Sequence, residues 1–446
     1  MKKLSLILLV AVLTIGLVGN AFAEAPAPGG PFSTAFTIQN TSGGAANCSF
    51  VLYDSTGASK YTSSPIAMAA DASSFVYVPS LSVDSGSYSG VVSCDAPVAA
   101  IVNFSSTISG ASHAGVGAAA ATWYVPVVYD NYYNFYTNFY VQNATASPVD
   151  ITISYYAPGS ATPVTTETAT AVPGYATHIF QQEGNATLAN NVSYSAKITA
   201  TGNVAAIVNI YGKSTANGQV YSFNAFTAGS KTAYVPQLMK NYYGYNTALT
   251  VQNISAVDAT VTVTYGNGAT AENAVIAAYS SKLFYTPNNT SFPSGATGIS
   301  GATITSVGGD IVAVVNESDG YNRAATYAGF TTGTSKVFAP IVMKRYYGYN
   351  TSIVCQNVGT TDTVATLSYT AGGLSHTVVS PTLAQGATYM FYQPSDGSLP
   401  NSYNGSAVIN ASASGKIICT VNENQNEAPQ ATQIMDQLFS YNGINQ

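Results

Sequence analysis

The chain has 446 residues, of which 46% are hydrophobic and only 7% are charged, and its formal net charge is −6 at neutral pH. This composition argues against a disordered protein, because disorder goes with little apolar content and high net charge. Scarce Lys and Arg argue against a nucleic-acid partner, since phosphate binding depends on clustered cations.

The N-terminus has the three zones of a secretory signal peptide. A basic start precedes an apolar run from Leu4 to Val18, and small residues follow at Ala21-Phe22-Ala23. We therefore predict a signal peptide at residues 1–23 and a mature chain that begins at Glu24. No later segment offers the 18 or more apolar residues that a membrane span requires. The mature chain is expected to be secreted to the extracellular cell surface, with no membrane span.

Two markers show that the mature chain is a tandem array. The stretch VPQLMKNYYGYNT, which begins at Val235, returns as APIVMKRYYGYNT from Ala339, and each copy is followed five residues later by Gln-Asn. A looser copy begins at Val125, and Gln39-Asn40 marks a fourth, trimmed one. The second marker is an asparagine that follows a Val- or Ala-rich run, and its four copies lie 106 or 107 residues apart: Asn103, Asn209, Asn316 and Asn422.

A period near 105 residues fits a whole β-sandwich domain and is too long for a solenoid repeat. Pro126, Pro236 and Pro340 are predicted to mark the boundaries, because proline has no N–H with which to continue a ladder. No flexible linker separates the repeats, which favours a semi-rigid rod. The predicted organisation is a signal peptide at residues 1–23 and β-sandwich repeats at 24–126, 127–236, 237–340 and 341–446.

Alternation of apolar and polar residues predicts the strands. In the third repeat, Val261-Thr262-Val263-Thr264-Tyr265 places Val, Val and Tyr on one face, which is typical of a half-buried strand. The mature chain shows no helical periodicity. The fold class is therefore predicted as all-β, with four tandem immunoglobulin-like β-sandwich domains in a rod. Further strands of this repeat are expected at 247–252, 273–277, 282–286, 302–306, 311–315, 323–327 and 335–339.

The four cysteines are expected to form disulfides, because the chain is exported. Cys48 and Cys94 lie in the first repeat, and Cys355 and Cys419 lie in the last. Pairing within each repeat is the simplest choice, and each bond could stabilise the fold by roughly 4 kcal/mol by restricting the unfolded chain.

The repeated unit, VP..MK.YYGYNT followed by Gln-Asn and by an alternating Thr/Val strand that ends in Tyr, resembles a repeat of large exported bacterial surface proteins with tandem immunoglobulin-like domains. The resemblance covers nearly the whole mature chain, closely in the third and fourth repeats and loosely in the first two. It implies a structural setting at the cell surface, and it supplies no catalytic residues.

No pattern predicts a catalytic, cofactor or metal site. The three histidines, His113, His178 and His376, lie at non-equivalent places in different repeats, so neither a triad nor a ligand cluster is indicated. Glu317 with Asp319, and Glu423 with Glu427, are the only local acidic groups. Their oxygens would suit calcium at a domain joint, but their spacing matches no EF-hand, and a solvated loop is the expectation.

The tyrosines that follow each boundary proline are the candidate interface. Tyrosine offers a large apolar face with a polar tip, so these side chains could pack the joint between domains, contact another subunit or stack on sugar rings. All three alternatives stay open on the sequence alone. The candidates are Tyr132, Tyr133, Tyr242, Tyr243, Tyr245, Tyr346, Tyr347 and Tyr349.

The leading hypothesis is a non-enzymatic structural protein of the bacterial exterior, in a surface layer, filament or sheath. The alternative is an adhesin or an array of carbohydrate-binding modules that uses exposed tyrosines. The expected partners are other copies, other surface proteins or glycans. The arm at 24–31, with the adjacent strand at Phe36–Gln39, is a candidate for donating a strand to another copy, since an unpaired edge is a template for pairing.

Overall fold

The structure is a computed structural model, which describes residues 7–13, 30–212, 218–370, 374, 376–412, 414–427, 436 and 438–445. Most of the predicted signal peptide and residues 24–29 of the predicted arm lie outside these ranges. Within them the fold is all-β, with four short 3-10 helices, η1 (Val78–Ser80), η2 (Thr286–Asn288), η3 (Gly295–Thr297) and η4 (Gln393–Ser395). No helix of the described residues is long and apolar enough to cross a membrane.

The strands fall into four successive units. Those of the first unit are β1 (Ile7–Leu13), β2 (Ser33–Asn40), β3 (Ala46–Tyr53), β4 (Ser59–Thr62), β5 (Ile66–Met68), β6 (Ser73–Tyr77), β7 (Tyr88–Cys94), β8 (Val98–Ser105) and β9 (Gly110–Ala114). Those of the second are β10 (Ala120–Tyr129), β11 (Phe135–Asn143), β12 (Val149–Tyr156), β13 (Thr165–Val172), β14 (Thr177–Gln181), β15 (Ser193–Gly212) and β16 (Val220–Asn224).

The third and fourth units continue the series. The third has β17 (Thr232–Met239), β18 (Asn246–Asn253), β19 (Ala259–Tyr265), β20 (Glu272–Ile276), β21 (Ser281–Tyr285), β22 (Ile299–Gly308), β23 (Ile311–Ser318) and β24 (Ala324–Ala328). The fourth has β25 (Lys336–Tyr346), β26 (Tyr349–Asn357), β27 (Ala365–Tyr369), β28 (Thr377–Val379), β29 (Thr388–Tyr392), β30 (Tyr403–Ala411), β31 (Ile417–Asn424), β32 (Leu438–Asn442) and β33 (Ile444–Asn445).

All four units share one strand order. In the third unit one sheet runs β17-β22-β19-β20 and the other runs β21-β18-β23-β24. The first unit repeats it as β1-β7-β3-β4 and β6-β2-β8-β9. In the second unit the long strand β15 serves both sheets, and in the fourth unit β25 pairs with β26, so the sheets of these units are joined. The alternation predicted for β19 is present, because every second residue from Ala259 to Tyr265 is buried.

The boundary prolines lie inside strands, which corrects the prediction that they separate the repeats. Pro126, Pro236 and Pro340 lie within β10, β17 and β25, the first strands of their units, at positions where the pairing register shifts. A bulge in an edge strand leaves a residue unpaired, so it tolerates the missing N–H of proline. The joints between units lie upstream, for example between β9 and β10.

The asparagine markers hold strands together. The side chain of Asn253, at the end of β18, is fully buried, and its Nδ2 donates to the carbonyl oxygens of Val257 and Ile276 at 2.7 and 3.0 Å. In the second set of markers, Asn316 accepts a hydrogen bond from Thr326 at 2.9 Å, which ties β23 to β24. Such buried amides satisfy backbone or hydroxyl groups that would otherwise be unpaired.

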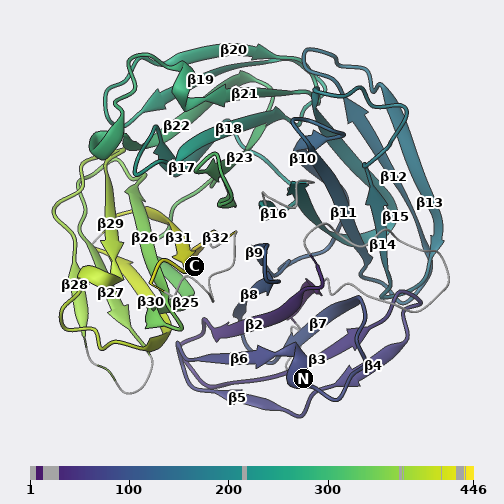
Figure 1. Cartoon of the computed structure of the whole chain (residues 1–446), viewed down its shortest axis with the longest axis horizontal. Coiled ribbons are helices and arrows are strands. Elements are labelled where there is room, and N and C mark those ends of the chain that lie inside the picture. The colour runs from purple at the N-terminus through teal and green to yellow at the C-terminus, as the bar shows by residue number, and fades with distance from the viewer. Residues whose placement is uncertain are drawn as a thin grey trace.

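The four units close into a ring, so the predicted rod is wrong (Figure 1). The fourth unit lies against the first, where Lys336 Nζ pairs with Asp71 Oδ1 at 3.0 Å and Asn103 Nδ2 donates to Glu423 Oε2 at 3.0 Å. One strand of each unit faces the centre, and β9, β16, β24 and β32 contact one another in a closed cycle. A rod would have kept the first and fourth units apart.

Backbone groups of all four units meet at Asp436, which is fully buried. Its N–H donates to the carbonyl oxygen of Ile108 in the first unit at 3.0 Å. Its carboxyl oxygens accept hydrogen bonds from the N–H groups of Val220 in the second unit and Ala324 in the third, at 2.8 and 2.9 Å. Asp436 itself precedes β32 of the fourth unit. This one residue therefore links the whole ring.

Both disulfides join cysteines of the same repeat. Cys48 pairs with Cys94 between β3 and β7, and Cys355 pairs with Cys419 between β26 and β31. The first and fourth units are the two that meet without a peptide connection.

Candidate functional site

Tight hairpins present the tyrosines of the repeated motif. The backbone N–H and C=O groups of Tyr242 and Tyr245 form two hydrogen bonds with each other, each of 3.0 Å. Tyr243 and Gly244 between them have φ values of 48° and 89°, which is the pattern of a type I′ turn. Tyr347 and Gly348 repeat it in the fourth unit. Tyr133 does so in the second unit, with Asn134 in place of the glycine.

The central tyrosine of each hairpin is exposed as well as strained. Tyr243 and Tyr347 expose 78% and 79% of their surface, and Tyr133 exposes 73%. A bulky residue with positive φ is uncommon, and it costs of the order of 1–3 kcal/mol. Each exposed ring meets its neighbour edge to face, with centroids 4.8 Å apart for Tyr242 and Tyr243. The hairpins thus hold a large aromatic face in solvent at a cost to folding.

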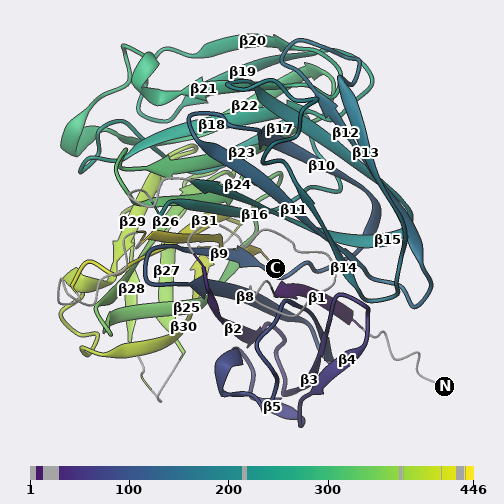
Figure 2. The same ribbon diagram turned by 45° about the vertical axis from the view of Figure 1, so that its right-hand side comes forward.

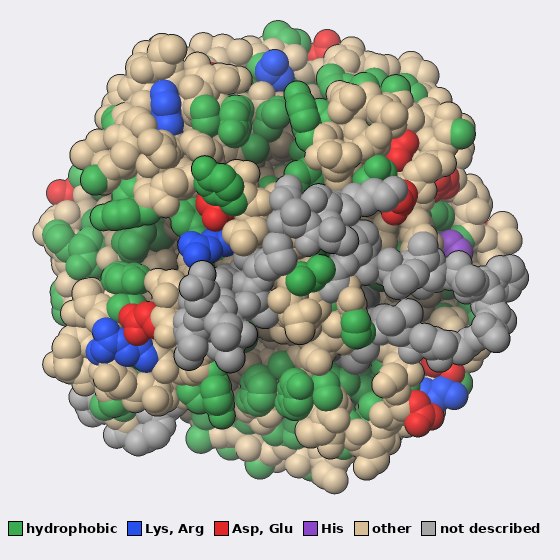
Figure 3. All heavy atoms as spheres, in the orientation of Figure 1, with side chains coloured by type: hydrophobic (Ala, Val, Ile, Leu, Met, Phe, Trp, Pro, Cys, Tyr) green, Lys and Arg blue, Asp and Glu red, His purple; other side chains and the backbone are tan. Residues whose placement is uncertain are grey.

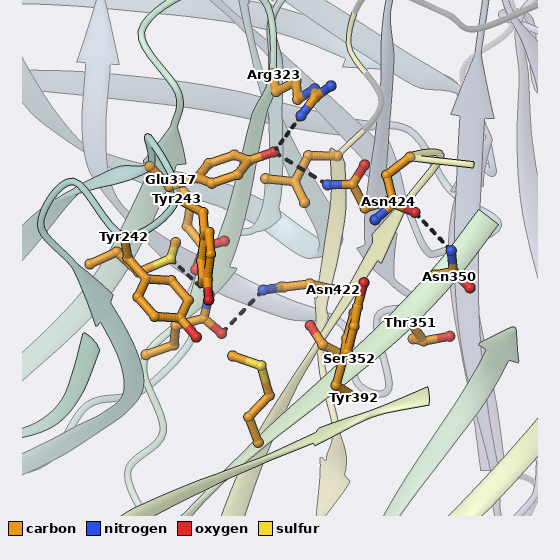
Figure 4. A pocket seen from close by; sticks show the side chains of 16 residues that line it. Tyr242, Tyr243, Glu317, Arg323, Asn350, Thr351, Ser352, Tyr392, Asn422 and Asn424 are labelled. Carbon is orange, nitrogen blue, oxygen red and sulfur yellow. Dashed lines mark hydrogen bonds between the residues drawn. The ribbon is translucent and has the colours of Figure 1, made fainter. Parts of the chain in front are cut away.

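A pocket of about 650 Å³ lies between the third and fourth units (Figure 4). Figure 4 shows Tyr242 and Tyr243 on one side and Tyr392 on the other, with Asn422 between them. The pocket is lined by Gln237, Met239, Tyr242, Tyr243, Tyr245, Glu317 and Arg323 of the third unit, and by Asn350, Thr351, Ser352, Met390, Tyr392, Asn422, Asn424, Asn426 and Leu438 of the fourth. We call it the 3/4 pocket.

Glu317 of β23 lies at the base of the 3/4 pocket. The residue is fully buried, and neither carboxyl oxygen has a hydrogen-bond partner in the described part of the chain. Burial raises the pKa of this carboxyl to about 8, because a charge without partners is poorly solvated there. Nearby, Asn422 Nδ2 donates to Gln237 Oε1 at 3.1 Å across the joint. At neutral pH the base of the pocket is therefore polar and uncharged at Glu317.

Hydrogen bonds also fix the side chains around Tyr245 and Asn350 in the 3/4 pocket. The hydroxyl of Tyr245 accepts from Arg323 Nη1 at 3.4 Å and from Asn424 Nδ2 at 3.3 Å, so a tyrosine of one unit is held by an amide of the next. Asn350 Nδ2 donates to Asn426 Oδ1 at 2.7 Å. These bonds orient side-chain amides toward the space between the units.

A related pocket of about 470 Å³ lies between the fourth and first units, and we call it the 4/1 pocket. The fourth unit contributes the residues that correspond in its repeat to Tyr242, Tyr243, Tyr245 and Glu317 of the third, namely Tyr346, Tyr347, Tyr349 and Glu423. The first unit contributes Tyr77 and Asn103 to the lining of the 4/1 pocket. Burial raises the pKa of Glu423 to about 8, while the hydrogen bond from Asn103 opposes this shift.

The second unit carries an altered site. Ile210 stands where the third and fourth units have glutamate, and Phe135 stands where they have the last tyrosine of the motif. Tyr132 stacks on Tyr129 with centroids 4.5 Å apart, and Phe135 packs against Tyr221. Its aromatic residues therefore pack largely with one another, although Tyr133 remains exposed. The buried carboxyl accompanies the complete Tyr-Tyr-Gly-Tyr-Asn motif.

The acidic residues correct one expectation from the sequence. Glu317 and Glu423 lie on strands β23 and β31 and are buried, so they do not belong to a solvated loop. Asp319 caps a turn by accepting from the N–H groups of Tyr321, Asn322 and Arg323. Glu427 pairs with Arg345 at 2.7 Å.

The histidines are placed apart. His376 pairs with Asp396 at 2.8 Å and stacks on Tyr369, whereas His113 and His178 lie in other units. Among the described residues, no group of three or more His, Cys, Asp or Glu side chains could hold a metal ion.

The buried glutamates predict that the protein loses stability as the pH rises. Their pKa in the folded state, about 8, exceeds the ordinary value of 4.5, so the folded chain keeps protons that the unfolded chain releases between these two pH values. Each group should lower the free energy of unfolding by up to about 1.4 kcal/mol per pH unit in that window. Denaturant unfolding from pH 5 to 8 measures the slope.

The double variant E317Q/E423Q should show a distinctly shallower slope, because glutamine does not titrate. Some slope should remain from Asp436, whose pKa is also raised well above its ordinary value by burial. An equal slope for the double variant and the parent chain would contradict the burial of these carboxyls.

Comparisons with known proteins leave the chain without a family. No family model matches it, and no curated protein sequence does. Among solved structures, Thermotoga maritima 1070 is 16% identical over 26% of this chain and 96% of its own, with a TM-score of 0.20. A tetra-tandem repeat in the extending region of a large adhesion protein is 13% identical over 90% of this chain and 92% of its own, with a TM-score of 0.13. At such scores neither likeness supports an argument about fold or function.

Proposed function

We propose that this chain is an exported, non-enzymatic protein of the bacterial cell exterior that binds carbohydrate in the 3/4 and 4/1 pockets. The observation that carries the proposal is the exposed, strained tyrosine beside each pocket, Tyr243 in one and Tyr347 in the other. Backbone strain with an exposed ring opposes folding, so its benefit lies in contact with something outside the chain.

The lining of the 3/4 pocket suits a sugar. Aromatic faces stack on the apolar faces of sugar rings, and side-chain amides offer a donor and an acceptor to neighbouring hydroxyl groups. Asn424, which is partly exposed, and Asn426, which is exposed, supply such amides. Charged side chains are few and scattered on the face shown in Figure 3. A neutral glycan therefore fits better than a phosphate-rich ligand.

Export is supported by the disulfides and by the N-terminal pattern. Disulfide bonds persist in oxidising compartments outside the cytoplasm, and all four cysteines are paired. A non-enzymatic role is supported by the acids of the 3/4 pocket, since Glu317 is the one carboxyl among its lining residues. Most glycoside hydrolases use a pair of carboxyl groups.

The ring favours the binding alternative over a filament or sheath. Tyrosines buried in the joints of a rod would have favoured the structural hypothesis. In the ring the two end units contact each other, and Tyr243 and Tyr347 stay exposed. The concave, aromatic joints are the arrangement expected of an adhesin-type protein.

Substitution of the exposed tyrosines tests this function. A panel of soluble oligosaccharides, such as cello-, xylo-, manno- and chito-hexaose, would be titrated calorimetrically against the mature chain. Y243A and Y347A should each weaken binding at their pocket at least tenfold, about 1.4 kcal/mol, because a stacking face is lost. Neither ring is part of the core, so folding should be preserved.

Tyr321 provides the matched control. It lies in a loop of the third unit, exposes 79% of its surface and does not line the 3/4 pocket. Y321A should bind with the affinity of the parent chain. Carbohydrate binding that is equally strong in Y243A, Y347A and Y321A, or no binding to any member of the panel, would count against the proposal.

A further inference from the structure

The first unit differs from the others in the origin of its first strand. In the third unit β17 ends at Met239 and β18 begins at Asn246. Asn246 thus lies seven residues after the end of β17. Seven residues before Ser33, where β2 begins, is Pro26, which is the expected end of the first unit's first strand. A strand of eight residues, as long as β17, would begin at Gly19. If the signal peptide is removed after Ala23, as the sequence predicts, only three of those eight positions remain. The predicted mature chain therefore lacks most of the residues that stand where the other units have their first strand.

The structure shows that the position accepts a strand. Here β1 occupies it and pairs antiparallel with β7, from Ile7 opposite Cys94 to Leu13 opposite Tyr88. Figure 2 shows β1 beside the strands of the first unit. β10, β17 and β25 hold the same place in the other units, beside β15, β22 and β30. β1 also lies against β8 of the opposite sheet, as β17 lies against β23.

We infer that the mature first unit presents β7 as an open edge and accepts an extended segment of a separate polypeptide at the place of β1. The inference uses the predicted export of the chain and goes beyond carbohydrate binding. An edge strand with unpaired N–H and C=O groups over an apolar face is a template for strand addition. Removal of β1 would also uncover part of β8, which lies against it.

The other units define the chemistry of the incoming segment. β10 and β17 contain no charged residue, and in both of them buried residues alternate with less buried ones before the proline. The charged residues of β25, Lys336, Lys344 and Arg345, lie outside its central segment, 337–343. β7 is uncharged as well. The partner segment is therefore about seven residues long, extended, uncharged and apolar on one face. The disulfide Cys48–Cys94 fastens β7 to β3 on its other side, so the acceptor edge is held in place without β1.

A second copy of the chain is a poor donor. The segments with the required pattern, β10, β17 and β25, are each paired in their own units. The strand-donation hypothesis from the sequence is wrong for Phe36–Gln39, because β2 lies between β6 and β8 and is paired on both sides. The observations thus favour a different polypeptide.

Hydrogen exchange on the exported chain tests the inference. After its mass has been shown to match a start at Glu24, the β7 amides that point away from β3 should exchange at least a hundredfold faster than the β22 amides that point toward β17, which are the internal control. The peptide KTAYVPQLMK, residues 231–240, should then bind once per chain and protect β7. The same peptide with A233D and V235D should not bind.

A fusion keeps the test decisive if the mature chain folds poorly. Residues 231–245, placed directly before Ser33, should supply the missing strand, restore folding, slow the exchange of β7 and abolish peptide binding. Retention of residues 7–13 in the exported protein would overturn the inference, as would β7 amides that are already as slow as those of β22. Dimerisation through β7 would show that the occupant is a second copy and would overturn a separate partner. None of these readouts depends on carbohydrate binding.

Discussion

The variant D436A is expected to open the ring and to lower the free energy of unfolding by roughly 2–6 kcal/mol. The substitution leaves the N–H groups of Val220 and Ala324 buried without an acceptor, and each such loss costs about 1–3 kcal/mol. These two groups belong to different units, so the loss falls on contacts between units. Denaturant unfolding and small-angle scattering of the variant measure the two effects.

Two controls separate the role of the carboxyl from simple side-chain removal. D436N keeps one carbonyl oxygen, so it should satisfy one of the two N–H groups and lose about half as much stability. D362A removes an exposed carboxyl and should stay within about 0.5 kcal/mol of the parent chain. A D436A protein with unchanged stability and unchanged dimensions would show that Asp436 does not hold the units together.

Local patterns were enough to predict the strands. The third unit shows this well, since the expected strands at 247–252, 282–286 and 311–315 overlap β18, β21 and β23. Each depends on alternation or on a short apolar run between turn signals, which are properties of neighbouring residues. The all-β class follows from the same local information.

The ring could not be predicted in this way. Its closure rests on contacts between residues far apart in the sequence, such as Asn103 with Glu423, and on backbone groups at Asp436. Backbone N–H groups are present in every residue except proline, so residue type gives no signal for them.

The prolines were wrongly predicted as repeat boundaries, because a bulge in an edge strand and a domain boundary both tolerate proline. Tyr327 supports the bulge after Pro236 by hydrogen bonding to both backbone groups of Gln237, a contact across 90 residues.

The sequence was enough to predict the tyrosines of the candidate site but not its buried glutamates. The tyrosines stood out as a repeated motif, and their exposure came from the type I′ turn. The glutamates were expected in a solvated loop, because their spacing with the neighbouring acids matches no EF-hand. Their position in the strand would have predicted their burial. Glu317 follows Ile311, Ala313 and Val315 at every second residue, and these three lie in the core. A carboxyl on the inner face of a strand is unusual enough to indicate a site.

The central claim is that the four units form a closed ring, and small-angle X-ray scattering of the exported chain tests it most directly. Four compact units of this size in a ring should give a radius of gyration of about 25 Å, whereas the same units in a line should give about 40 Å. We expect a value near 25 Å that does not depend on protein concentration. A value near 40 Å would contradict the ring, and with it the 4/1 pocket and the role of Asp436.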